Sequence, residues 1–431
     1  MWEKFKGDLA IYAASKVVFG VSSFLVVGLL TRAMDPSQYG AYTLLFAVIT
    51  ITTTVATSFL TNSVIRYVPL AAEEKRLRPF NYVLTQIAGV TVLISSLVCG
   101  AALWGTQALG LLALTPDMVA VGLVLSACSA AFQIYTIYCY SSRRRRLYSY
   151  LVVTQVLIFV IGAFLVPFVT LNPITTTVAF LTVSYAVPIV MYKMPYPRWT
   201  AGFDRRVKQT TVGFLKYGTP LIALNIVVQL NTYLDQFMLR AMRSAEEVGI
   251  YAANYVVADK VVYAISSLVA LALGPLVFRE WERRNELTAY QMIWKGVFVF
   301  VALSLPVVIV MLAFPDSVMS VLTAPEYADG RVIIPYVMVG AVLAGVSSII
   351  AYVLSIHYRT VELAICFAAS LATNGALNVL LIPTFGSLGC AFSTTTSSAV
   401  LLLVLLWRVS VFKGFLSQIA PGVVSMFRWG R

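Results

Sequence analysis

Leu30-Thr-Arg-Ala-Met34 followed by Gly40-Ala-Tyr42 occurs a second time in this chain, as Leu239-Arg-Ala-Met242 followed by Gly249-Ile-Tyr251. The second copy begins about 208 residues after the first, close to half of the 431 residues. Each copy stands between two long apolar runs. The repeat therefore predicts a duplicated chain, in which a short polar turn joins two membrane helices at the same place in each half.

The composition excludes a soluble globular protein. Hydrophobic residues make up 60% of the chain and charged residues 11%, and the mean hydropathy is +0.86. Such a chain has too little polar surface to face water, so it is predicted to cross the membrane several times. The five cysteines lie inside apolar runs without CxxC spacing and are interpreted as packing residues. The single histidine, His357, argues against a histidine-based metal site.

Twelve apolar runs are long enough to span a bilayer, since about 20 residues of helix cross ~30 Å of hydrocarbon. The expected fold is therefore all-α, with about twelve transmembrane helices in two pseudo-symmetric six-helix halves that enter the membrane in the same sense. The predicted division is an N-terminal bundle at 1–192, a cytoplasmic linker at 193–213, a C-terminal bundle at 214–407 and a basic cytoplasmic tail at 408–431. The runs are 9–31, 40–62, 80–103, 117–141, 148–169, 175–192, 214–239, 249–277, 291–314, 332–356, 361–382 and 388–407.

Lysines and arginines predict the orientation, because positive residues collect on cytoplasmic loops. With the N-terminus inside, 25 of the 31 fall in inner segments, and those outside are Arg32, Arg240, Arg243 and Arg331. Both termini are therefore predicted to be cytoplasmic. The net charge of +13 then belongs to the inner face, where it attracts anionic membrane lipids. The run Arg143–Arg146 is interpreted as a topology anchor, and no nucleic-acid partner is expected.

Three blocks of motifs carry a resemblance to a known family. They are Leu29–Leu45 with Asp35-Pro-Ser-Gln-Tyr-Gly40; Tyr217-Gly-Thr-Pro220 with Asp235 and Val248-Gly-Ile-Tyr251; and Asn374 and Asn378 with Ile382-Pro-Thr-Phe-Gly386 and Gly389-Cys-Ala391. On these motifs the chain resembles the polysaccharide transporter branch of the multidrug/oligosaccharidyl-lipid/polysaccharide (MOP) exporter superfamily, which contains the O-antigen and exopolysaccharide flippases. The match covers nearly the full length, and it rests on the order and spacing of motifs that are individually weak.

This resemblance implies a MATE-like transporter in the bacterial plasma (inner) membrane. Its substrate would be an undecaprenyl-diphosphate-linked oligosaccharide, flipped from the inner to the outer leaflet for O-antigen, capsule or exopolysaccharide assembly, together with other membrane proteins of that assembly. The residues show no GxxxxGK[ST] motif for hydrolysis. Transport by alternating access would therefore draw on an ion gradient, the membrane potential or consumption of product. No cofactor is expected other than a coupling H⁺ or Na⁺.

Ionisable residues inside spans are the candidate site, because each is expensive there and marks a pathway by default. Lys16 and Lys260 are predicted to attract the diphosphate in a cationic cavity. Asp235 or Asp259 is predicted to take up and release the coupling ion. Asp259 and Lys260 are about 100° apart on a helix, so at most one of them would point squarely into a cavity.

Each of these residues also has a possible structural role. Asp235 could lock its hairpin through Asn254, and it could reach Lys260 only if the two spans are staggered. Lys16 could extend to the inner headgroups. Asn254, Asn374 and Asn378 are candidates for a polar lining, although amides at helix contacts more often bond neighbouring helices.

Three competing functions remain open. A cation-coupled multidrug antiporter should line its path with excess acidic groups, whereas here two lysines balance two aspartates. A peptidoglycan-precursor flippase would carry two additional spans. A polytopic polysaccharide polymerase or glycosyltransferase would need a large outer loop or a carboxylate pair at a membrane face, for which the candidates are Asp316, Glu326 and Asp329. Enzymatic activity is not expected.

Overall fold

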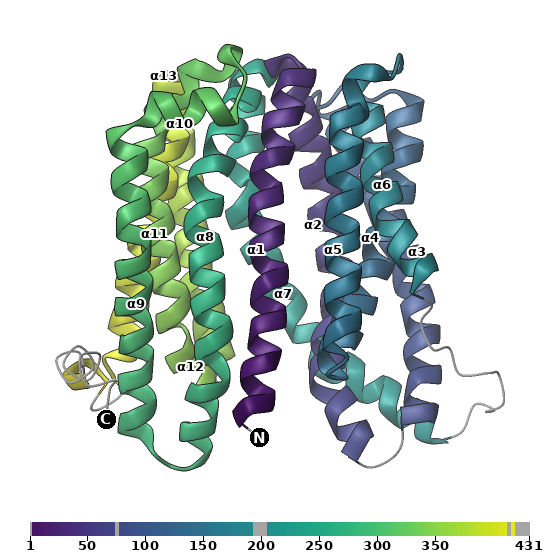
Figure 1. The fold of residues 1–431 in the computed structure, drawn as a ribbon, viewed down its shortest axis with the longest axis vertical. Helices are drawn as coiled ribbons and strands as arrows, with labels where there is room; N and C mark the ends of the chain where they lie inside the picture. The colour runs from purple at the N-terminus through teal and green to yellow at the C-terminus, as the bar shows by residue number, and fades with distance from the viewer. Residues whose placement is uncertain (1, 74–76, 193–204, 412–414, 419–431) are drawn as a thin grey trace. The chain divides into compact units, whose positions relative to one another are not determined.

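A computed structural model describes residues 2–73, 77–192, 205–411 and 415–418. Within these ranges the side chains of residues 2–17, 70, 72–73, 77–79, 205–211, 215–217, 220 and 416 are not described. The described residues are almost entirely helical and contain no strand (Figure 1). Nine helices among them are long and apolar enough to cross a membrane, and α1 contains a further apolar stretch, Val18–Ala33. The predicted all-α membrane fold is confirmed.

The helices follow one another with short connections. Their bounds are α1 (Trp2–Ala33), α2 (Pro36–Glu73), α3 (Leu77–Ala108), α4 (Pro116–Ser141), α5 (Arg145–Leu165), η1 (Val166–Phe168), α6 (Pro173–Met191), α7 (Arg205–Met242), α8 (Ala245–Glu282), α9 (Glu286–Ala313), α10 (Pro315–Leu322), η2 (Pro325–Ile333), α11 (Ile334–Ile350), α12 (Tyr352–Ile356), α13 (Thr360–Val409) and η3 (Leu416–Gln418).

The longest helix, α13, consists of two arms. Its backbone leaves the helical conformation at Gly386, where φ is 55° and ψ is −129°. The break follows Pro383, which cannot donate a helical hydrogen bond. It falls between the apolar runs predicted at 361–382 and 388–407. Helices α1 to α9, α11 and the two arms therefore make up the twelve long helices expected from hydropathy.

The chain divides into two compact units inside α7, unit 1 being Met1–Tyr233 and unit 2 Leu234–Arg431. The first part of α7 belongs to unit 1 because it lies against α2. A Cβ atom at Gly218 would stand only 2.3 Å from the carbonyl oxygen of Phe59, so glycine permits this close approach of two backbones. The predicted division placed residues 205–213 of this helix in the linker at 193–213 and the rest of it in the C-terminal bundle at 214–407, and this division stays a prediction.

The repeated motif forms the same kind of turn in both units. Two residues separate α1 from α2, and two separate α7 from α8. In unit 1 the backbone N–H of Gln38 donates to Asp35 Oδ1 at 2.9 Å. In unit 2 the N–H of Glu247 donates to Ser244 Oγ at 3.1 Å. Each turn thus begins its second helix with a side-chain cap, which satisfies a backbone donor that has no partner within the helix.

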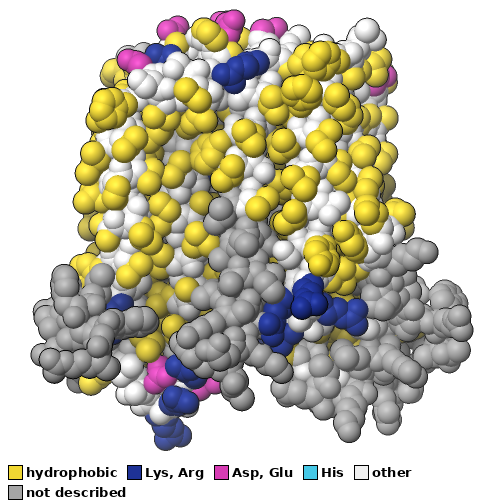
Figure 2. Space-filling view, viewed as in Figure 1, with side chains coloured by type: hydrophobic (Ala, Val, Ile, Leu, Met, Phe, Trp, Pro, Cys, Tyr) yellow, Lys and Arg dark blue, Asp and Glu magenta, His cyan; other side chains and the backbone are white. Residues whose placement is uncertain are grey.

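Apolar side chains cover much of the helix surface in Figure 2. On α3, Leu93, Leu97 and Trp104 are 67%, 74% and 74% exposed. Contiguous apolar exposure of this extent is rare on soluble monomers and is expected where acyl chains replace water. The structure therefore agrees with a multi-pass membrane protein.

Candidate functional site

A buried carboxylate connects three helices of unit 2. Asp235, on α7, is 4% exposed. Its Oδ2 accepts hydrogen bonds from the hydroxyl of Tyr251 on α8 and, at 3.5 Å, from that of Thr394 on α13. Its Oδ1 accepts the backbone N–H of Gln236 at 2.9 Å. Since both oxygens have donors, the packed site can hold the charged carboxylate.

Two asparagines extend this network along α13. Asn378 Nδ2 donates to Asn374 Oδ1 at 3.0 Å, and Asn374 Nδ2 donates to Thr394 Oγ1 at 3.3 Å. The hydrogen bonds therefore form a chain from Asn378 through Asn374 and Thr394 to Asp235, in which each side chain donates to the next. Asn374 and Asn378 are 2% and 0% exposed, so in this structure they bond neighbouring polar groups inside the packed unit.

The repeat shows that the turn does not require this carboxylate. The two copies are offset by 208 residues before the turn and by 209 after it, so Val27 stands where unit 2 has Asp235, and Tyr42 stands where it has Tyr251. Val27 and Tyr42 are buried, at 5% and 6% exposure. An apolar residue therefore fills the same position in unit 1, and the same turn still forms. Because burying a carboxylate is costly, Asp235 is better explained by a task specific to unit 2 than by closure of the hairpin.

Among the described hydrogen bonds, none joins Asn254 to Asp235. Asn254 Nδ2 donates to the carbonyl oxygens of Ile250 within α8 and Tyr327 in η2, both at 2.9 Å. The hypothesis that Asp235 locks its hairpin through Asn254 is wrong, because the partner is Tyr251, one helical turn nearer the connection. Asn254 instead fastens the irregular segment before α11 to α8.

Asp259 and Lys260 pair with each other. Lys260 Nζ lies 4.0 Å from Asp259 Oδ2, and the side chains are 37% and 25% exposed, respectively. The ammonium also lies 5.3 Å from the ring centroid of Tyr263. The conceivable pair between Asp235 and Lys260 is not formed. The charges of Asp259 and Lys260 therefore largely cancel, and both side chains are exposed enough to contact a polar ligand.

The break in α13 is held by the second copy of the repeated turn. Arg243 donates through Nε to the carbonyl oxygen of Ile382 at 3.1 Å and through Nη2 to that of Pro383 at 2.8 Å. Glu247 Oε1 accepts the backbone N–H of Ser387 at 2.7 Å. A cation thus meets the C-terminal end of one arm and an anion meets the N-terminal end of the next, as helix dipoles favour.

The family model described as "Polysaccharide biosynthesis protein" matches residues 7–281, which is more than half of the chain. The chain belongs to this family. The resemblance derived from the sequence is thereby confirmed. No curated protein matches the chain.

Solved structures share the fold of this polysaccharide biosynthesis family member over nearly its whole length. The lipid II flippase MurJ, in an inward closed conformation, has a TM-score of 0.65 at 15% identity, covering 97% of this chain and 91% of that one. An inward-facing multidrug resistance MATE transporter of the MOP superfamily has a TM-score of 0.69 at 12% identity, covering 93% and 99%. The MATE transporter VcmN of Vibrio cholerae has a TM-score of 0.66 at 15% identity, covering 96% and 99%. The predicted MATE-like fold is therefore confirmed.

Sequence reasoning singled out Asp235 in this family member but missed its partners. Tyr251 belongs to the repeated motif and was interpreted only as part of a turn. Arg243 was interpreted only as an outer-loop cation. A proline and a glycine between two apolar runs are the signal that could have pointed to Arg243 and Glu247, because a broken helix frees backbone groups that need partners. Lys16 lies on α1, and its side chain is outside the described part of the structure, so its role stays a prediction.

Removing only one charge of the Asp259–Lys260 pair is expected to destabilise the protein more than removing both. Asp259→Asn leaves the ammonium unpaired within a span, at an expected cost of about 1 to 2 kcal/mol. The double variant Asp259→Asn/Lys260→Gln should recover most of this loss. Thermal unfolding midpoints in detergent measure both effects. A double variant no more stable than the single one would contradict the pairing.

Proposed function

We propose that this protein translocates undecaprenyl-diphosphate-linked oligosaccharide units from the cytoplasmic to the outer leaflet of the bacterial inner membrane, supplying O-antigen, capsule or exopolysaccharide assembly. The observation that carries the proposal is the family match over residues 7–281. It is supported by a helical membrane fold of the kind found in a lipid II flippase. A polysaccharide-related family combined with a transporter fold favours movement of the sugar carrier over its synthesis.

The proposed task explains why such a chain is needed. Each sugar hydroxyl taken into hydrocarbon without a partner costs roughly 2 to 7 kcal/mol, so a headgroup requires a polar path. The lipid tail can remain in the bilayer. An inside-negative potential favours outward movement of a negative charge by about 2.3 kcal/mol per 100 mV, so it drives the diphosphate in the required direction.

Ion coupling is assigned to Asp235. This carboxylate is buried among three helices of unit 2, and its repeat position in unit 1 carries Val27. The hydroxyl and backbone N–H groups that donate hydrogen bonds to this carboxylate stabilise its charged form. Uptake of H⁺ or Na⁺ would neutralise the carboxylate for part of the transport cycle. Lys16 and Lys260 are proposed to attract the diphosphate. Lys260 is suited to this because it is 37% exposed beside Asp259, so a stronger anion can compete for it.

Depletion of the protein in its host tests the function. Undecaprenyl-linked oligosaccharide is expected to accumulate in the inner leaflet, where an added membrane-impermeant glycosidase cannot reach it in intact spheroplasts. Accumulation in the outer leaflet would instead favour a polymerase or ligase. A cell that assembles its polysaccharide normally but becomes sensitive to ethidium would favour a multidrug antiporter, and either result would overturn the proposal.

A further inference from the structure

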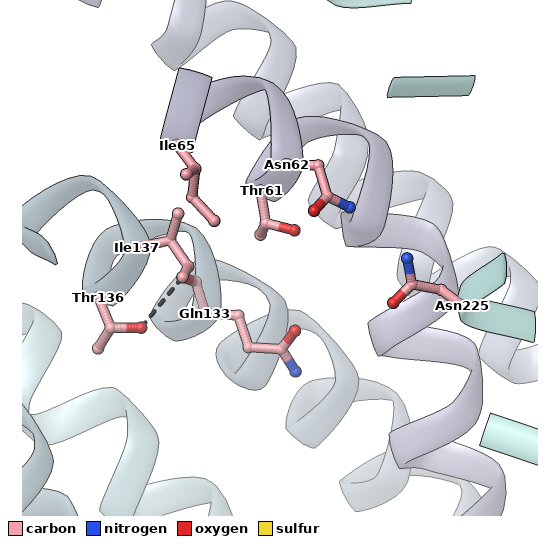
Figure 3. A pocket seen from close by; sticks show the side chains of 7 residues that line it. All are labelled: Thr61, Asn62, Ile65, Gln133, Thr136, Ile137 and Asn225. Atoms are coloured by element: carbon pink, nitrogen blue, oxygen red, sulfur yellow. Dashed lines mark hydrogen bonds between the residues drawn. The ribbon is translucent and has the colours of Figure 1, made fainter. Parts of the chain in front are cut away.

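A second polar site lies in unit 1, where α2, α4 and α7 meet (Figure 3). It is a pocket of about 360 Å³. This volume is at the small end of the ~300 to 1,000 Å³ typical of small-molecule sites. Among the described residues that line it, the polar side chains are amides and hydroxyls, and none is charged. They are Thr61, Asn62, Gln133, Thr136 and Asn225.

The pocket lies toward the predicted cytoplasmic side. Thr61 and Asn62 belong to the second half of α2, which ends at Glu73. Gln133 and Thr136 belong to the last turns of α4, immediately before the basic turn Arg143–Arg146. A headgroup arriving from the cytoplasm would therefore meet this pocket early.

Two asparagines present acceptors to the pocket. Asn62 Nδ2 donates to the carbonyl oxygen of Ser58, and Asn225 Nδ2 donates to that of Leu221, each at 2.8 Å. These bonds lie within each asparagine's own helix and fix the orientation of the amide. Among the described residues nothing donates to either Oδ1, so both oxygens can accept a hydrogen bond from a ligand.

Gln133 presents a donor. Its Oε1 lies 3.0 Å from the hydroxyl of Thr57, whose proton is shared with the carbonyl oxygen of Thr53 at 2.9 Å, and its amide nitrogen donates to no described residue. Thr57 is 1% exposed and acts as a positioning residue. The hydroxyls of Thr61 and Thr136 donate to backbone oxygens of their own helices at 3.2 and 2.9 Å, which leaves their oxygens as acceptors.

This set of atoms matches one class of ligand. Phosphate and carboxylate groups accept hydrogen bonds and need several donors, whereas this pocket consists mainly of acceptors. A cationic drug would be matched by a carboxylate, and none lines the pocket. A sugar hydroxyl donates one hydrogen bond and accepts others, so it can use both the amide oxygens and the Gln133 nitrogen.

We propose that this pocket binds an uncharged sugar residue of the lipid-linked substrate on its cytoplasmic side. The inference rests on the proposed function and assigns the sugar end of the carrier to unit 1. Binding here would let the protein distinguish a carrier that bears its oligosaccharide from the bare undecaprenyl diphosphate.

The test compares two probes on the full chain in lipid nanodiscs by native mass spectrometry: undecaprenyl diphosphate, and the same lipid bearing the oligosaccharide extracted from the host. The wild type is expected to prefer the sugar-bearing lipid. Gln133→Leu and Asn225→Leu, on two different helices, should each reduce this preference about 3- to 10-fold, the effect of one or two lost hydrogen bonds. Affinity for the bare lipid should not change.

Gln155→Leu is the matched control. Gln155 is a buried amide on α5 whose Nε2 donates to Ser184 Oγ at 3.2 Å, away from the pocket lining, so its loss should leave the preference intact. If the wild type prefers the sugar-bearing lipid and both pocket variants keep that preference, the pocket assignment is overturned while the proposed function stands. A wild type without preference, together with unimpaired flipping in depleted cells, overturns both. Loss of ethidium binding in the pocket variants would identify a cation site instead.

Discussion

Transport by an Asp235→Asn variant is expected to lose its dependence on an ion gradient while the protein remains folded. Asparagine keeps the shape of the side chain, and its oxygen can still accept the hydroxyl of Tyr251, but it cannot bind and release a proton or balance a sodium ion. Coupling between two sites typically changes affinity by about 5- to 150-fold. We therefore expect gradient-driven transport by the variant to be about 5- to 150-fold lower than that of the wild type. Flipping of the sugar-bearing lipid in proteoliposomes, with and without an imposed gradient, measures the effect.

Glu280→Gln is the control for Asp235→Asn. Glu280 is also a buried carboxylate, at 7% exposure, but it lies near the end of α8 and pairs with Arg279 and Arg283 at 3.3 and 3.4 Å. We expect this variant to retain its response to the gradient. Undiminished gradient-driven transport in Asp235→Asn would remove the coupling assignment and leave the carboxylate a structural role. Equal losses in both variants would point to general destabilisation.

Gly386→Ala is expected to destabilise the protein strongly. The backbone there has φ 55° and ψ −129°, a conformation that residues with a Cβ atom rarely adopt. An added Cβ would stand 1.9 Å from Oε1 of Glu247, the oxygen that accepts the N–H of Ser387. Backbone strain and the displaced hydrogen bond together should cost about 3 to 5 kcal/mol. Thermal unfolding of the detergent-purified protein measures this loss.

Two further variants separate the steric effect from the backbone strain. Gly110 also has a positive φ, 69°, but nothing lies within 4 Å of an added Cβ, so Gly110→Ala should cost only about 1 kcal/mol. Adding Glu247→Ala to Gly386→Ala should recover part of the stability, because it removes the atom that the new Cβ meets. Equal losses at the two glycines, with no recovery in the double variant, would show that the contact with Glu247 contributes nothing.

Hydropathy was sufficient to predict the long helices and their order, because spanning a bilayer requires a run of apolar residues whatever surrounds it. The repeated motif likewise predicted two tight turns, since a polar stretch between two apolar runs has to connect them. The Pro383 and Gly386 pair marked the break between the last two spans for the same local reason. These features depend on neighbours in the chain.

The partners of the candidate residues depended on packing between helices. Helix length and depth placed Asp235 level with Asn254, but a shift of one turn brings Tyr251 to the carboxylate instead, and hydropathy does not register such a shift. Thr394 reaches it only because the second arm of α13 packs against α7 and α8 in unit 2.

The sequence alone determined that this is a helical membrane protein, predicted its duplication, and placed Asp235 among the ionisable residues inside its spans, because hydropathy and charge act residue by residue. Only the tertiary structure decided which groups meet: Tyr251 and Thr394 at Asp235, Arg243 and Glu247 at the break in α13, and Asn62, Gln133 and Asn225 around one pocket. These contacts depend on how each helix is rotated and staggered relative to its neighbours. Many sequences with the same apolar pattern could pack differently.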